Sequence, residues 1–212
     1  MLMQIFLDIE TLPPSKNNPL VEAKFGNLKD RKYRRLALRV EYAILLAIGV
    51  KIFVDGKFEL EGVFGRDRGN LMFHLDERRI LRAFWKTIRR FNPDRILFIG
   101  HNILDFDLRL IWQRSIIHQI KPTAQINFAR YRSSDVYDTM WQFTGWRHRI
   151  SLDEVAGLLG LESSKTSEFN GGKVYDLFLE GRHQEIADYC MRDVELARQI
   201  YDYLIFAKAE KC

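Results

Sequence analysis

The chain has 212 residues, of which 47% are hydrophobic and 29% are charged, a composition typical of a globular protein that excludes a disordered or fibrous chain. Its longest apolar run, residues 42–50, is too short to cross a bilayer, so no membrane association is expected. The net charge of +5 favours a polyanionic partner, although such an excess also occurs in proteins that bind nothing charged.

The chain is expected to form one domain over residues 1–212, because no Pro-, Gly- or Ser-rich linker divides it. A signal peptide would need its apolar stretch where Asp8 and Glu10 occur, and no basic region precedes them. The two cysteines, Cys190 and Cys212, cannot form a disulfide framework, and no zinc-binding pattern is visible. The sequence therefore predicts a cytoplasmic protein.

The first predicted element is an apolar strand that begins near residue 3 and ends in Asp8 and Glu10. Residues two apart in a strand point to the same face, so both carboxylates project together. Two close, buried carboxylates repel each other unless a cation lies between them, and Mg²⁺ or Mn²⁺ suits carboxylate oxygens. The pair predicts a metal site, although the same spacing recurs at Asp193 and Glu195.

A basic segment follows the break Leu-Pro-Pro-Ser at residues 12–15. It contains Phe25, Tyr33 and the cations Lys24, Lys29, Arg31, Lys32, Arg34, Arg35 and Arg39. This mixture suits phosphate contacts combined with base stacking. A solvated helix face would explain the same charges equally well, so both interpretations stay open.

Two strands and a helix come next. Residues 43–53 and 57–64 are rich in aliphatic and aromatic side chains, and Asp55-Gly56 between them predicts a hairpin. Residues 76–91 predict a helix that Asn92-Pro93 ends. A second basic series on this helix is expected to be a solvated face, and it consists of Arg78, Arg79, Arg82, Lys86, Arg89 and Arg90.

A buried strand at residues 95–100 precedes a helix over about residues 104–120, and Asp107 falls near the start of that helix. Functional sites in such sheets gather at strand ends, and a helix N-terminus tolerates negative charge. Asp107 is therefore a candidate partner of Asp8 and Glu10. Charge complementarity at the helix start would also explain it, and the neighbouring Asp105 is the alternative partner.

The remaining elements are a short strand around Val136, a helix opened by the capping box Ser151 to Glu154, and a long helix over about residues 184–206. Together the elements predict an α/β fold with a mixed sheet flanked by helices.

The long C-terminal helix has a clear apolar face when its residues are placed at about 100° intervals. That face consists of Ile186, Cys190, Val194, Ala197, Tyr201 and Leu204. Tyr189 and Asp193 lie at its rim, one turn apart, where a carboxylate is costly to bury without a cation or donor. Glu195 and Asp188 point to solvent, so neither Asp193-Glu195 nor His183-Asp188 forms a site. A similar pair, Tyr131 and Asp135, lies in a loop and is discounted.

Three motifs in this order resemble the exonuclease motifs of the DnaQ-like superfamily, the DEDD exonucleases. They are Asp8-Ile9-Glu10-Thr11, His101-Asn102 through Phe106-Asp107, and Tyr189-x-x-x-Asp193, whose Tyr marks the DEDDy branch. Residues 151–161, with Lys165, residues 171–174 and residues 188–190, look like the proofreading domain of B-family DNA polymerases. The chain is most similar to stand-alone predicted 3′-5′ exonucleases related to that domain. The resemblance covers nearly the whole chain, and residues 24–39 match it least clearly.

The resemblance implies a ribonuclease H-like fold and a 3′-5′ exonuclease that releases nucleotides from single-stranded nucleic acid. Two divalent ions, Mg²⁺ or Mn²⁺, would be bound by Asp8, Glu10, Asp107 and Asp193. Tyr189 would orient the attacking water, because a phenol with a pKa near ~10 is a poor base at neutral pH. Thr11, Leu12 and Asn102 are expected to contact the substrate.

Three alternatives to a DNA exonuclease stay open. The motifs handle the phosphodiester and not the sugar, so an RNA-processing exonuclease fits as well. A second alternative is a nucleic-acid-binding module that lost its chemistry, although all four acids are present. A third is a metal-dependent endonuclease of the wider ribonuclease H-like group, against which the Tyr-x-x-x-Asp motif argues by analogy. The sequence does not indicate the oligomeric state or the pathway.

Overall fold

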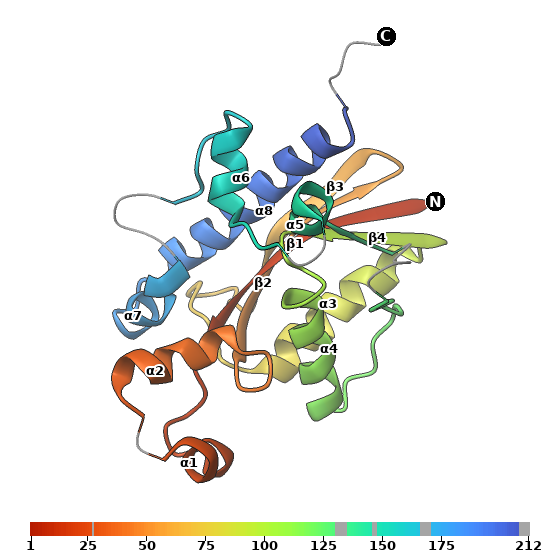
Figure 1. Cartoon of the computed structure of the whole chain (residues 1–212). Helices are drawn as coiled ribbons and strands as arrows, with labels where there is room; N and C mark the ends of the chain where they lie inside the picture. Colours follow the sequence, from red (N-terminus) through yellow and green to blue (C-terminus); the bar gives the residue numbers. More distant parts are fainter. Residues whose placement is uncertain (27, 130–134, 146–147, 166–170, 208–212) are drawn as a thin grey trace.

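A five-stranded mixed sheet with helices on both faces forms the centre of the computed structural model, which describes residues 1–26, 28–129, 135–145, 148–165 and 171–207 (Figure 1). The strands lie in the order β3-β2-β1-β4-β5. Neighbours β3, β2 and β1 are antiparallel, whereas β1, β4 and β5 are parallel. The strands are β1 (Leu2–Leu12), β2 (Ile44–Val54), β3 (Lys57–Phe64), β4 (Arg95–Gly100) and β5 (Val136–Asp138). The expected fold class, a ribonuclease H-like mixed sheet, is confirmed.

The central strand β1 divides the core into two layers. Its residues Ile5 and Leu7 belong to one apolar cluster with buried side chains of α3 (Glu77–Phe91) and α4 (Asp107–Ile117). Phe6, which points the opposite way, packs with Val194 and Tyr201 of α8 (His183–Leu204). Because successive side chains alternate across a strand, the even-numbered residues after Phe6 also face α8. The pattern of β1 therefore directs two acidic side chains toward the C-terminal helix.

The end of β1 differs from the expectation that the strand would stop at its two acids. It continues to Leu12, and its pairing with β2 shifts between Glu10 and Thr11. Thr11 and Leu12 pair with Leu45 and Ile44 of β2, so the hydrogen-bonded ladder extends two residues beyond the acids. The two carboxylates consequently lie within a paired strand, just before an irregularity that bends it.

The long helices occur where the sequence predicts them, with shifted ends. α4 begins at Asp107 and ends at Ile117, because residues 101–106 form a turn instead of the first helical turn. α8 spans His183 to Leu204, and its predicted apolar face is buried at Ile186, Cys190, Val194, Ala197 and Tyr201. The capping box of Ser151 and Glu154 opens α6 (Leu152–Leu158) as expected. Two further short helices are α5 (Thr139–Thr144) and α7 (Val174–Leu179), the latter preceded by a 3-10 turn at Gly171–Lys173.

The basic segment folds into α1 (Pro19–Phe25), α2 (Asp30–Arg34) and a 3-10 turn at Arg35–Leu38. Its own small core consists of Val21, Tyr33 and Leu36. Tyr33 is only 6% exposed and its hydroxyl donates to the carbonyl of Pro14 at 2.7 Å. The hypothesis that Tyr33 stacks on bases is therefore wrong, because the ring is used to hold the segment together. Phe25 packs edge-on against Tyr42, with ring centres 5.2 Å apart.

The second basic series is exposed on α3, as expected for a solvated face. Four of its cations, Arg82, Lys86, Arg89 and Arg90, line a hollow together with Lys121. In the part of the chain that the structure describes, no helix is long and apolar enough to cross a membrane. Tyr131 and Cys212 lie outside the described residues.

Candidate metal centre

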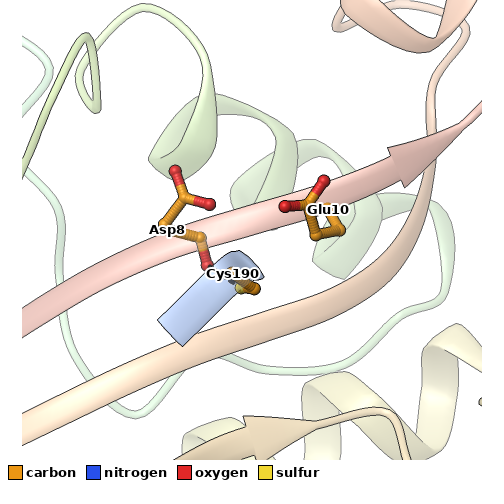
Figure 2. A group of neighbouring side chains, drawn as sticks. All are labelled: Asp8, Glu10 and Cys190. Atoms are coloured by element: carbon orange, nitrogen blue, oxygen red, sulfur yellow. Dashed lines mark hydrogen bonds between the residues drawn. The ribbon is translucent and has the colours of Figure 1, made fainter. Parts of the chain in front are cut away.

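Asp8 and Glu10 project from the same face of β1 toward α8 (Figure 2). One oxygen of each carboxylate and the sulfur of Cys190 on α8 all lie within 4.8 Å of one another. The two acids were predicted to share a face from their spacing alone, and the structure shows that arrangement.

Gly49 of β2 lets α8 approach this part of the sheet. It pairs with Asp8 across the two strands. A Cβ atom at Gly49 would lie 2.6 Å from the sulfur of Cys190 and 3.2 Å from a methyl carbon of Val194. Because only a missing side chain leaves room for the helix here, Gly49 controls where α8 presents its own polar residues.

Asp107 contacts β1 between the two acids of the strand. One oxygen of its carboxylate accepts a hydrogen bond from the backbone N–H of Ile9, at 3.1 Å. The side chain is 5% exposed and is the first residue of α4, where the helix dipole favours a negative charge. Asp105, the alternative candidate, lies in the preceding turn and is partly exposed.

Tyr189 and Asp193 complete the arrangement from α8. Both are buried, at 5% and 8% exposure, and both line the same cleft as Asp8 and Glu10. Glu195 is directed elsewhere, because it forms an ion pair with Lys51 of β2 at 2.9 Å. Asp188 is exposed, as its helical position predicts.

The four acids interact strongly with one another. Burial raises the pKa of Asp8 and of Glu10 well above its ordinary value, and the charges of Asp193 and Asp107 raise it further. Burial also raises the pKa of Asp107 to about 8, opposed by the hydrogen bond from Ile9 and reinforced by Asp193. The pKa of Asp193 is raised by burial too, against the lowering effect of the Ser164 and Tyr189 hydroxyls. Without a cation, the four carboxylates therefore cannot all be ionised at neutral pH.

The donor set fits hard divalent cations. Oε1 of Glu10 and Oδ1 of Asp193 are buried without a hydrogen-bond partner among the described residues, and such oxygens are costly unless something binds them. Carboxylate oxygens are the preferred ligands of Mg²⁺ and Mn²⁺. Cys190 does not belong to the set, because burial and the adjacent carboxylates raise the pKa of its thiol. The protonated sulfur donates to the backbone carbonyl of Asp8 at 3.7 Å.

A cleft of about 410 Å³ opens onto Asp8, Glu10 and Asp193, whereas Asp107 is not among the residues that line it. Its floor includes Asp8, Glu10, Tyr189 and Asp193, and other parts of its wall come from the basic segment and from α7. Burial raises the pKa of Tyr189, and the charges of Asp193, Glu10 and Asp8 raise it further, so this side chain stays a neutral phenol. The cleft therefore combines carboxylates, a neutral hydroxyl and nearby arginines.

The three residues predicted to contact a substrate have different surroundings. Thr11 lines the cleft, but its hydroxyl donates to the carbonyl of Ala37 at 2.7 Å. Leu12 packs in an apolar cluster with side chains of α7 and α8. Asn102 has a left-handed backbone with φ of 57° and its N–H donates to Asp138. A substrate contact for these three residues stays a prediction.

Asp138 is a positioning residue that the sequence analysis missed. Its carboxylate accepts hydrogen bonds from the N–H groups of Asn102, Leu104 and Met140 at 3.0 to 3.1 Å. It thereby fixes the turn that leads into Asp107 and caps α5, and burial raises its pKa to about 6. An Asp at the end of a strand and directly before a helix is an N-cap signal that could have identified it.

Comparisons with known proteins agree with this geometry. A family model described as "Predicted 3'-5' exonuclease related to the exonuclease domain of PolB" matches residues 38–212. That range contains Asp107, Tyr189 and Asp193, whereas Asp8 and Glu10 precede it. No curated protein matches the chain.

Two similar solved structures come from Saccharomyces cerevisiae. One is the apo Pan2 pseudoubiquitin hydrolase-RNA exonuclease (UCH-Exo) module in complex with AAGGA RNA, with a TM-score of 0.50 and 12% identity over 99% of this chain and 30% of that chain. The other is the same module with A7 RNA, with a TM-score of 0.42 and 13% identity over 98% of this chain and 30% of that chain. This chain thus spans less than a third of either structure, and the first likeness shows the fold alone.

Proposed function

The chain belongs to the family of predicted 3′-5′ exonucleases related to the exonuclease domain of PolB, and we propose that it removes nucleotides successively from the 3′ end of single-stranded DNA. The observation that carries this proposal is that Asp8, Glu10 and Asp193 line one cleft, while Asp107 of α4 accepts a hydrogen bond from Ile9 between the two acids of β1 and its charge raises the pKa of both. We further propose that residues 1–212 form this single exonuclease domain, since β1 lies outside the matched range yet supplies two of the four acids.

In the proposed mechanism, Asp8, Glu10, Asp107 and Asp193 hold two divalent cations, Mg²⁺ or Mn²⁺. Bound there, the cations would supply activation of a water molecule and stabilisation of the departing 3′-oxygen. Support comes from the unsatisfied oxygens of Glu10 and Asp193 and from the raised pKa values of the whole set. Tyr189 keeps its proton, so its hydroxyl orients the attacking water and does not act as the base.

RNA is the second candidate polymer. The similar Pan2 module was solved with RNA, but at 12% identity it supports only the fold. The family's relation to PolB favours DNA, because that description refers to a polymerase exonuclease domain. Both polymers present the same phosphodiester to the four acids, so the distinction depends on contacts to the sugar.

The test incubates the purified protein with 5′-labelled single-stranded DNA and RNA, in Mg²⁺ or Mn²⁺ and in EDTA. We expect a ladder that shortens from the 3′ end, with DNA as the preferred polymer, and that disappears in EDTA. Shortening of RNA but not of DNA would show that RNA is the substrate. Metal-independent cleavage, or cleavage within the strand, would contradict the proposed mechanism.

A further inference from the structure

The seven cations of the folded basic segment fall into three groups according to their contacts. Lys24, Arg34 and Arg39 already contact partners within the protein: Lys24 and Arg39 lie over aromatic rings, and Arg34 pairs with Asp30 and Asp176. Lys29 and Lys32 are exposed outside the cleft. Arg31 and Arg35 line the cleft, and among the described residues neither has an ion-pair or cation-π partner.

The segment that carries Arg31 and Arg35 is fixed to the rest of the protein at three points. Thr11, directly after the acids of β1, donates its hydroxyl to Ala37. Tyr33 donates to Pro14, and Arg34 pairs with Asp176 of α7. Arg35 lies between the attachments at Arg34 and Ala37, and Arg31 lies two residues before Tyr33, so both arginines belong to a segment that is fixed beside the cleft they line.

The charge balance of the cleft shows what these two arginines are suited to bind. Four carboxylates would be balanced by two divalent cations, while Arg34 is balanced by its own acidic partners. Arg31 and Arg35 then remain as the uncompensated charges of the cleft, next to the acids. Guanidinium groups bind phosphate oxygens in a bidentate manner, which makes phosphate the matching anion.

The same wall offers an apolar surface. Leu38 lines the cleft and is 67% exposed, so its side chain is accessible to a ligand in the cleft. A base stacked there, with its phosphate toward an arginine, would use both features. The cleft volume of about 410 Å³ lies in the range of ligand-binding sites.

We propose that Arg31 and Arg35 bind the backbone phosphates of the single strand near its 3′ end, and that residues 31–38 form the substrate-holding wall of the site. This inference rests on the proposed exonuclease function and assigns a role to the basic segment. Three of the seven cations of the segment line the cleft, and of these only Arg34 is paired with acids among the described residues, which leaves Arg31 and Arg35 for a ligand.

The experiment measures binding without hydrolysis. A short 5′-fluorescein single-stranded DNA is titrated with the protein in Ca²⁺, its integrity is checked on a gel, and the affinity is followed by anisotropy over a series of NaCl concentrations. Each phosphate contact to a single strand contributes about 0.7 to the slope of log affinity against log salt. R31Q and R35Q should each lower the slope by about 0.7 and the low-salt affinity by roughly tenfold.

The matched control is the double variant K29Q/K32Q, which removes the same charge from the same segment outside the cleft. Its slope should stay close to that of the unmodified protein, whereas R31Q/R35Q should lose about 1.4. Equal decreases of the slope in the two double variants would overturn the inference, because the segment would then attract DNA only through its overall positive charge. An unchanged slope in R31Q/R35Q would also overturn it. Absence of binding by the unmodified protein would instead count against the proposed function itself.

Discussion

At the scale of single residues, the site depends on carboxylates that raise one another's pKa. Burial is the largest cause for each of the four acids, and the neighbouring acids add to it for Asp8 and Glu10. Burying like charges this close is unfavourable for the protein alone, and a cation converts the same arrangement into a binding site. The arrangement is therefore better explained by ligand binding than by stability.

The first prediction concerns Asp8. Asp8→Ala should lower hydrolysis by about a thousandfold or more, because it removes a proposed metal ligand, and the loss of such a ligand costs several kcal/mol of transition-state stabilisation. Binding of single-stranded DNA in Ca²⁺ should weaken far less, since Arg31 and Arg35 are unchanged. A gel assay of hydrolysis and an anisotropy titration measure the two effects. Hydrolysis at the unmodified rate would remove Asp8 from the proposed metal ligands.

The second prediction concerns Tyr189. Tyr189→Phe should slow hydrolysis by roughly 10- to 100-fold, because it removes the hydroxyl that we propose orients the water, while the carboxylates remain. The dependence of the rate on pH should keep its shape, since a phenol whose pKa is raised does not titrate in the working range. Steady-state rates over a pH series measure this. A loss as complete as that of Asp8→Ala would show that Tyr189 does more than orient water.

At the scale of elements, the site depends on how closely α8 approaches the sheet. The missing side chain of Gly49 leaves space that the sulfur of Cys190 on α8 fills. Tyr189 and Asp193 lie within one turn of Cys190 on the same helix. The turn before α4 is set separately by Asp138, which links it to α5. Contacts of Gly49 and Asp138, neither of which is a proposed catalytic residue, thus position α8, the turn before α4, and α5.

The third prediction follows from the space at Gly49. Gly49→Ala should destabilise the protein by about 1–3 kcal/mol, because the new methyl group would overlap Cys190. It should also lower hydrolysis by up to roughly a hundredfold through the shift of α8. Adding Cys190→Ala removes the overlapping sulfur and should recover part of both losses. Chemical denaturation and the gel assay measure these effects.

The control for that prediction is Gly69→Ala, where an added Cβ would meet nothing within 4 Å. This variant should have nearly unchanged stability and activity. Additive losses in the Gly49 and Cys190 double variant would contradict the steric explanation, because contacting residues should show a coupling energy.

At the scale of the whole molecule, the buried acids make the stability of the chain depend on pH. The pKa of Asp107 rises from an ordinary 3.8 to about 8 in the folded state, so the folded state binds its proton more tightly than the unfolded state does. The corresponding stability is fully present below about pH 4 and is lost as the pH rises through about 8. The pKa values of Asp8 and Glu10 shift in the same direction.

The fourth prediction therefore concerns the metal-free protein. In EDTA, the contribution of these acids should make the free energy of unfolding fall as the pH is raised from 5 to 8, and Mg²⁺ or Mn²⁺ should restore more stability at pH 8 than at pH 5. Asp107→Asn keeps an acceptor for the N–H of Ile9 but cannot titrate, so its pH dependence should be flatter. Thermal denaturation over this pH range measures both effects. A metal-induced stabilisation that is equal at both pH values would contradict the assignment.

Local patterns predicted much of the architecture and indicated the candidate site residues. Alternation placed Asp8 and Glu10 on one face, helical spacing put Asp193 at the rim of a buried stripe, and the capping box opened α6. Each of these depends on residues a few positions apart, whose geometry the backbone period fixes. Each of the three motifs is also local in sequence, and their order along the chain was enough to indicate the family.

Tertiary structure alone decided the features that depend on distant partners. Pairing with β2 extends β1 beyond its two acids, and the missing side chain of Gly49 lets α8 pack close to the sheet. Packing against Leu36 and Val21 buries Tyr33, so its ring is not available to stack on a base. Tertiary structure also brought Arg31, Arg34 and Arg35 to the cleft and, among the described residues, paired only Arg34 of these with acids, in a segment whose sequence allowed either a binding surface or a solvated face. The physical reason is that a cation's role depends on which charges it faces, and those charges come from strands and helices far away in the sequence.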